Sequence, residues 1–156
     1  MDEKGITLIE LLVTITILAV LAAIVVPLSQ MSVKRQKEME LRRDLRVIRT
    51  AIDDYKKAWD EGRIKRNIGD TGYPPNLSVL VDGVEDATST EHKKIRFLRR
   101  LPRDPMTADE NLSPEETWGM RSYSSPPDDP SEGSDVFDVY AKSSESAIDG
   151  TPYKSW

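Results

Sequence analysis

A single carboxylate, Glu10, lies near the start of a long apolar run. The run from Ile6 to Leu28 has 23 residues, and Glu10 is its only ionisable side chain. A charge well inside a membrane-spanning helix costs about 2.5–3.5 kcal/mol on insertion scales, and less near an end of the helix. Because such residues are rarely kept without a role, Glu10 is a candidate functional residue, and pairing with a cation is the chemistry that it offers.

The rest of the chain shows no residues arranged for catalysis. One histidine and no cysteine exclude His–Cys pairs and most histidine-based metal sites. The histidine, His92, stands between Glu91 and Lys93, which is typical of a solvated residue. The neighbouring acids Asp128 and Asp129 lie in a proline-rich stretch, where solvation explains them. We therefore expect a protein that is not an enzyme.

The apolar run has the length of a membrane helix, and its helical pattern continues beyond it. Spanning a bilayer takes about 20 residues, each of which advances a helix by about 1.5 Å. Residues 6–28 predict a transmembrane helix, and residues 29–61 predict its amphipathic continuation. Gly62 is the expected stop. Pro27 removes one backbone donor and should interrupt the helix mildly.

Apolar residues recur every three or four positions in the second half of this helix. We interpret them as ordinary core, with a coiled coil as the alternative. They are Leu41, Leu45, Ile48, Ile52, Tyr55 and Trp59.

Residues 62–156 predict a small globular head with two strands. Met120–Ser124 and Val136–Ala141 are the strand candidates, and an antiparallel hairpin packed on the helix is the simplest arrangement. The fold class is therefore α+β, a long helix against a small antiparallel sheet. Asn76 is a candidate cap for a short helix.

The remaining stretches of the head predict little regular structure. Residues 82–90 and 106–117 read as polar loops, and residues 91–101 as a short helix or an extended piece. The tail is expected to turn back before Trp156.

Charge is distributed unevenly along the chain. Residues 34–66 hold 12 basic and 7 acidic side chains, net +5, whereas residues 104–149 hold 2 basic and 12 acidic, net −10. Acids such as Glu38 and Asp44 are interleaved in the basic part, and no stacking aromatics accompany it. Nucleic acid is therefore not an expected partner.

The start of the chain resembles a type IV prepilin or pseudopilin signal. Gly5 ends a short charged leader, residues 1–5, and Glu10 follows inside an unbroken apolar run. In that family a prepilin peptidase cuts after the glycine, the new N-terminus is methylated, and the glutamate guides filament assembly. The resemblance implies cleavage between Gly5 and Ile6, methylation of Ile6, assembly through Glu10, and a helix segment at Pro27 that can unwind in filaments.

The head resembles the major pseudopilin of type II secretion systems. The resemblance rests on residues 101–105 (Leu-Pro-Arg-Asp-Pro), Trp118-Gly119, residues 138–140 (Asp-Val-Tyr) and Trp156. In the family the Asp-Pro and Trp-Gly pieces adjoin, whereas residues 106–117 separate them here.

Major pseudopilins bind calcium in the loop after the last main strand. The matching loop here is residues 142–150, in which Ser144 and Asp149 are the candidate ligands. Calcium prefers six to eight oxygen ligands. The loop has fewer carboxylates than the family loop, and Lys142 adds a positive charge, so a hydrogen-bonded turn is the favoured interpretation over a calcium site.

The resemblance also implies a function, partners and a location. It implies a structural subunit of the pseudopilus, a helical filament that is assembled from the inner membrane and drives protein secretion. Expected partners are further copies of the chain, other pseudopilins, the prepilin peptidase, the inner-membrane assembly platform with its ATPase, and membrane lipid. The expected location is a single pass through the inner membrane with a periplasmic C-terminal domain.

Three alternatives remain open from the sequence. They are a type IV pilus pilin, a minor pseudopilin, and a membrane-anchored binding module that does not polymerise. The module is favoured by Lys34, Arg35 and Lys37, because positive residues after a membrane span tend to stay in the cytoplasm and would keep the head there.

Overall fold

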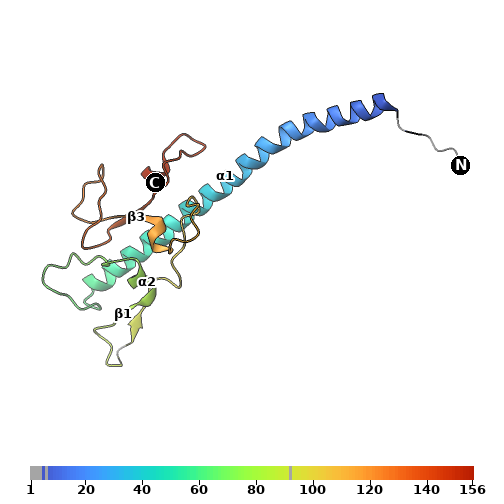
Figure 1. The fold of residues 1–156 in the computed structure, drawn as a ribbon. Helices are drawn as coiled ribbons and strands as arrows, with labels where there is room; N and C mark the ends of the chain where they lie inside the picture. The colour runs from blue at the N-terminus through green and yellow to red at the C-terminus, as the bar shows by residue number, and fades with distance from the viewer. Residues whose placement is uncertain (1–4, 6, 92) are drawn as a thin grey trace. The chain divides into compact units, whose positions relative to one another are not determined.

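The computed structural model describes Gly5, residues 7–91 and residues 93–156. The chain divides into two compact units, one that ends at Gln36 and one that runs from Lys37 to Trp156. Figure 1 shows one long helix, which is followed by short helices and pairs of short strands. In order they are α1 (Leu8–Asp60), α2 (Ser78–Asp82), β1 (Val84–Glu85), β2 (Lys94–Ile95), η1 (Glu115–Thr117), β3 (Trp118–Arg121), β4 (Asp138–Ala141) and η2 (Tyr153–Ser155).

The long helix predicted over residues 6–61 is confirmed from Leu8 to Asp60, while Ile6 lies outside the described residues. Its end follows from Gly62, whose φ of 75° lies in the left-handed region that favours glycine. The Gly62 amide donates to the Trp59 carbonyl at 3.0 Å, and the Arg63 amide donates to the Ala58 carbonyl at 2.9 Å. These two bonds form a Schellman motif, which satisfies carbonyls at the end of α1.

The predicted apolar stripe of α1 faces the core of the second unit. Leu41 and Ile48 are fully buried, and only Trp59, the last member, is partly exposed. Burying one such aliphatic side chain contributes about 1.5–3 kcal/mol relative to leaving it in water. The interpretation as ordinary core is therefore confirmed, because side chains of the head occupy the stripe. The core residues beyond α1 include Leu77, Leu80, Trp118, Val136, Val139 and Tyr153.

The first part of the head is built around α2. Asn76 Oδ1 accepts the Val79 amide at 3.0 Å, which confirms its capping role. The Leu80 carbonyl of α2 then accepts the amides of Phe97 and Leu98, each at 2.9 Å. These bonds hold the chain that follows β2 against the helix.

One loop prediction in this part was wrong. Residues 82–90 were expected to form a loop, but β1 lies inside them and pairs antiparallel with β2. A strand of two residues is too short to show the alternation that reveals strands in a sequence. For residues 91–101 the extended alternative holds at Lys94–Ile95. His92 lies outside the described residues.

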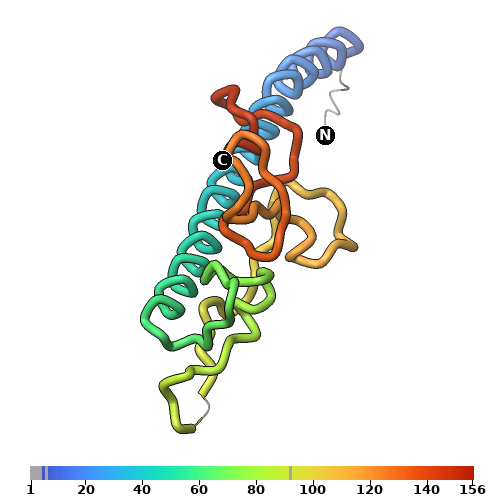
Figure 2. Tube along the Cα trace, turned by 90° about the vertical axis from the view of Figure 1, so that its left-hand side faces the viewer, coloured from blue at the N-terminus to red at the C-terminus, as the bar shows by residue number. Residues whose placement is uncertain are grey.

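The predicted antiparallel hairpin is formed by β3 and β4, with Trp118 opposite Ala141 and Arg121 opposite Asp138. Residues 120–124 were expected as the first strand, but β3 begins two residues earlier and ends at Arg121. The chain turns after Arg121 because the Ser122 amide donates to the Ser131 carbonyl at 3.0 Å. Figure 2 shows the hairpin beside the second half of α1, and together they confirm the α+β class.

Candidate functional site

The first turn of α1 carries Glu10 and is capped by Thr7. Thr7 Oγ1 accepts the Glu10 amide at 3.3 Å, and the Thr7 carbonyl accepts the Leu11 amide at 3.1 Å. A threonine cap with a glutamate three residues later has the pattern of a capping box. Sequence reasoning missed this role, although Thr-x-x-Glu before an apolar run is a readable signal.

Glu10 stands exposed at the start of α1. It lies in the first helical turn, where the helix dipole presents partial positive charge, and its side chain is exposed. Gly5 is also exposed and lies outside the helix. Ile6 and leader residues 1–4 lie outside the described residues, so cleavage before Ile6 and its pairing with Glu10 stay predictions.

The first half of α1 presents an apolar surface on all sides. Its large aliphatic side chains between Leu8 and Leu28 are exposed, and α1 is long and apolar enough to cross a bilayer. Thr14 and Thr16 do not break this surface, because their hydroxyls donate to carbonyls one turn earlier, at 2.9 and 2.8 Å. This surface needs lipid or another apolar helix to cover it.

Pro27 lies inside α1, and the helix continues through it without a break in its bounds. Proline has no amide hydrogen, so one backbone carbonyl of the preceding turn loses its helical partner. The predicted interruption is thus limited to that missing bond. Whether this segment unwinds in a filament remains a prediction.

Two pieces of the head that are separated in sequence meet in space. Trp118 Nε1 donates to the Pro102 carbonyl at 2.9 Å, and the indole is fully buried. The Asp104 amide donates to Thr117 Oγ1 at 3.1 Å. Residues 106–117 therefore leave and re-enter the fold at one place, and the Asp-Pro and Trp-Gly pieces lie next to each other in space.

Asp104 is a buried carboxylate in this corner. Its side chain is 2% exposed, and Oδ1 accepts the Met106 amide at 2.8 Å. Burial raises the pKa of Asp104 above its ordinary value, although amides that donate to the carboxylate oppose this rise. Asp104 thus stabilises the turn after Pro102 through Oδ1, while its Oδ2 is buried without a hydrogen-bond partner among the described residues.

The calcium candidates lie in the loop after β4. Ser144 is exposed, whereas Asp149 is already engaged. Asp149 Oδ1 accepts the amide of Thr151 at 2.9 Å and its hydroxyl at 2.6 Å, and Asp149 Oδ2 lies 3.4 Å from Arg42 Nη2. The hydrogen bonds from Thr151, and then the Arg42 charge, hold the pKa of Asp149 below its ordinary value. Asp149 is thus already engaged by Thr151 and Arg42, and calcium binding through Ser144 and Asp149 stays a prediction.

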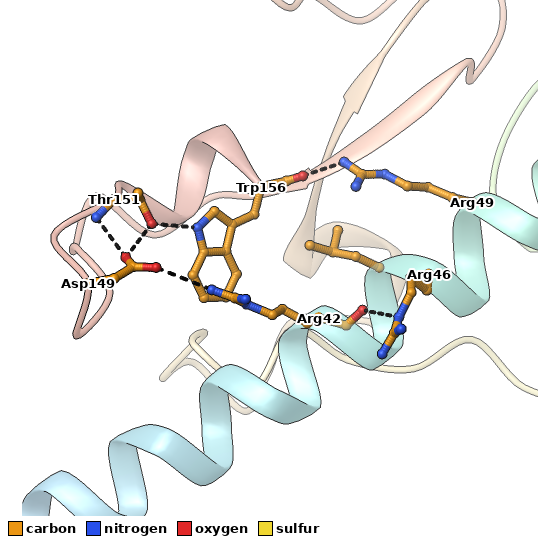
Figure 3. A pocket seen from close by; sticks show the side chains of 7 residues that line it. Arg42, Arg46, Arg49, Asp149, Thr151 and Trp156 are labelled. Carbon is orange, nitrogen blue, oxygen red and sulfur yellow. Dashed lines mark hydrogen bonds and ion pairs between the residues drawn. The ribbon is translucent and has the colours of Figure 1, made fainter.

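An open cavity of about 640 Å³ lies between this loop and α1, and Figure 3 shows the side chains that line it. The Arg42 guanidinium lies 4.0 Å from the centre of the Trp156 ring, and Trp156 Nε1 donates to Thr151 Oγ1 at 2.8 Å. Arg49 Nη2 donates to the Trp156 carbonyl at 2.5 Å. Arg46 lines the same cavity and donates to the Arg42 carbonyl. The wall of the cavity is thus rich in guanidinium groups. The sequence does not reveal this wall, because the contacts between α1 and the tail join residues 107 or more positions apart.

No group of three or more histidine, cysteine, aspartate or glutamate side chains within residues 7–91 and 93–156 is placed to hold an ion. The acids that lie close to one another, such as Asp44 and Asp104, have a neighbouring arginine or backbone amides as partners.

These features together define a type IV pilin-like protein. The long helix has an exposed apolar first half, a capped carboxylate in its first turn, and a small α+β head on its second half. The sequence agrees, because the family model for the prokaryotic N-terminal methylation motif matches residues 1–26.

The comparison with curated proteins narrows the class. The chain is 29% identical to the type II secretion system core protein G of Klebsiella pneumoniae over 138 residues, which covers 85% of this chain and 91% of the relative. It is 30% identical to the protein of the same name from Pseudomonas aeruginosa, over 67% of this chain and 68% of the relative. The chain belongs to this family, the major pseudopilins of type II secretion. No solved structure matches it.

Proposed function

The chain is a structural subunit of a type II secretion pseudopilus, and we propose that Glu10 drives its assembly by pairing with the N-terminal amine of a neighbouring subunit. The observation that carries the proposal is the place of Glu10. It is the one ionisable side chain between Leu8 and Leu28, and it stands exposed in the first turn of a helix whose other side chains there are apolar or hydrogen-bonded within the helix.

The proposed chemistry begins with processing. Cleavage after Gly5 releases an ammonium group on Ile6, four positions before Glu10. Opposite charges at low dielectric attract far more strongly than in water. While the subunit waits in the membrane, the ammonium group of Ile6 and the carboxylate of Glu10 belong to one chain, four positions apart, and neutralise each other locally. In the filament the amine of an incoming subunit meets Glu10 of its neighbour, which fixes the axial register.

Family membership supports the cellular location that this proposal assumes. Homologous pseudopilins and the methylation motif support anchoring in the inner membrane with the head in the periplasm. The finer partners belong to the proposal. They are a prepilin peptidase for Gly5 and Ile6, other pseudopilins, and an assembly platform whose ATPase supplies energy.

The test is the variant Glu10→Gln, produced together with the other secretion components. A capping box accepts glutamine as well as glutamate, and the hydrogen bond from the Glu10 backbone amide to Thr7 Oγ1 does not involve the Glu10 side chain, so the helix cap survives. We expect normal cleavage, normal membrane insertion and severely reduced filament yield. The N-terminal mass of the purified subunit reports cleavage, and electron microscopy of sheared fractions reports filaments.

Two further variants serve as controls. Glu10→Asp keeps the charge and should retain part of the filament yield. Gly5→Leu should stop at the uncleaved precursor, because a side chain clashes where glycine enters a tight peptidase site. Wild-type filament yield from Glu10→Gln would end the charge-pairing model, and a mature N-terminus at Ile6 in Gly5→Leu would show that the cut site is elsewhere.

A further inference from the structure

The segment after β4 is held against α1 by side chains of the helix. Glu38 Oε1 accepts the Ile148 amide at 2.8 Å and the Tyr153 hydroxyl at 2.9 Å. One turn later, Arg42 meets Asp149 and stacks on Trp156. We call Glu38, Arg42 and Arg49 of α1, with Asp149, Tyr153 and Trp156, the C-terminal clasp.

Within the clasp, Asp149 is the carboxylate that the sequence offers as a calcium ligand. One of its oxygens accepts two hydrogen bonds from Thr151. Its other oxygen faces the Arg42 guanidinium. An arginine is always charged at physiological pH, so a divalent cation placed beside this oxygen would meet a like charge.

The described side chains around Asp149 also do not supply the cluster of carboxylates that a calcium site draws on. Calcium takes six to eight oxygens at about 2.3–2.6 Å. In the described residues no third acidic or histidine ligand gathers here, and Arg46 and Arg49 line the same cavity. The residues present therefore do not fit the ion that the family loop implies.

We infer that a guanidinium takes the place of the metal in this subunit: Arg42 and Trp156 close the C-terminal segment on α1, and the head folds without calcium. The ion pair alone is weak, because the side chains of Arg42 and Asp149 are 56% and 54% exposed. The stacking of the guanidinium on the indole adds to it. The indole in turn donates to Thr151, which shapes the turn around Asp149. The parts thus stabilise one another.

The inference does not depend on filament assembly, so it is tested on the full-length subunit in detergent. Thermal unfolding is recorded with excess calcium and with a calcium chelator. An ion that binds only the folded state raises its stability with concentration. We expect the same unfolding temperature in both conditions. A calcium-dependent rise in that temperature would overturn the inference, whatever the outcome for Glu10.

The second arm tests the clasp itself by hydrogen exchange at the amides of Ala147 and Tyr153, which bond within the segment. Arg42→Gln removes both the charge and the stacking group, and exchange there should become about three- to tenfold faster. Arg46→Gln is the matched control, because Arg46 lines the same cavity but bonds to a backbone carbonyl of its own helix, and exchange should not change.

A milder variant keeps the test open if Arg42→Gln does not fold. Asp149→Asn retains an oxygen for Thr151 but loses the charge that faces Arg42, and it should speed exchange at the same amides by a smaller factor. Unchanged exchange in both Arg42→Gln and Asp149→Asn would show that the clasp does not hold the segment, and would contradict the inference.

Discussion

Asp135 shows how a buried carboxylate can be kept charged. Only 5% of its surface is exposed, yet Oδ1 accepts the Ser122 hydroxyl at 2.7 Å and the Tyr123 amide at 2.9 Å, and Oδ2 accepts the Thr71 hydroxyl. Burial works to raise the pKa of Asp135, but these hydrogen bonds outweigh it and the net pKa lies below the ordinary 3.8. Asp135 thus ties the connector after α1 to the turn that follows β3.

This network leads to a prediction about acid stability. Because the folded pKa of Asp135 is depressed, its charged form stabilises the fold above pH 3.8, and this contribution is lost as the pH falls through the folded pKa. Asp135→Asn should destabilise the head by about 1–3 kcal/mol at neutral pH. Urea unfolding at neutral pH and below pH 3.8 measures this effect, and the difference between wild type and variant should shrink in acid. A difference that is constant with pH would contradict the charged role.

Some of the functional and structural residues could be predicted from the sequence, and others could not. Glu10 could be predicted because a lone charge in an apolar run is costly and therefore visible. Asp135 and Arg42 could not, since acids and arginines are common on surfaces. Their partners, such as Thr71 for Asp135 and Trp156 for Arg42, are brought near only by the folded chain.

At the scale of elements, the β3–β4 hairpin depends on Gly119. A Cβ placed on Gly119 would lie 2.3 Å from Cε2 of the Tyr140 ring, which covers that position from the opposite strand. The close approach explains the glycine that follows Trp118, because no side chain fits beneath the ring.

Gly119→Ala should therefore destabilise the head. Forcing extra atoms into a packed contact costs about 1–3 kcal/mol. Thermal unfolding of the full-length subunit measures the loss. In a Tyr140→Leu background the ring is gone, and the same substitution should cost clearly less. An equal cost in both backgrounds would place the effect in the backbone of β3 rather than in contact with the ring.

Sequence patterns predicted the long elements of this fold well and the short ones poorly. The long helix and its stripe were predicted because their periodicity extends over many turns. The hairpin was predicted, but β3 was placed two residues late, since the turn at Ser122 is set by its bond to Ser131. The pairing of β1 with β2 could not be predicted, because two-residue strands are too short to show an alternation of apolar and polar residues.

At the scale of the whole molecule, some charged side chains of the basic and acidic segments form ion pairs within the chain, and, in the part that the structure describes, other acidic side chains are exposed without an ion-pair partner. Arg42–Asp149 and Arg49–Asp138 join the basic and acidic segments inside one subunit. In the described residues, Asp128, Asp129 and Glu132 are exposed and form no ion pair. We expect these exposed acidic side chains to attract the basic residues 34–66 of a neighbouring subunit.

Attraction between these exposed charges of neighbouring subunits predicts that the stability of the filament decreases as the salt concentration rises. Exposed charges are screened over about 8 Å at physiological ionic strength, and more strongly as salt rises. Filaments should release subunits faster in high salt, as measured by sedimentation. Asp128→Lys combined with Asp129→Lys should lower filament yield while leaving the unfolding temperature of the single subunit unchanged. Filaments whose stability is independent of salt would count against pairing between subunits.

The closed base of residues 106–117 has a consequence for how this subunit can vary. The Asp104–Thr117 bond and the Trp118–Pro102 bond join the two ends of the excursion, so its length does not set the register of the hairpin. Doubling the length of a flexible loop costs only about 0.6 kcal/mol in closure entropy. A reporter peptide or a different surface epitope can therefore be inserted at the exposed tip of the excursion, residues 108–111, while the hairpin beneath it keeps its geometry.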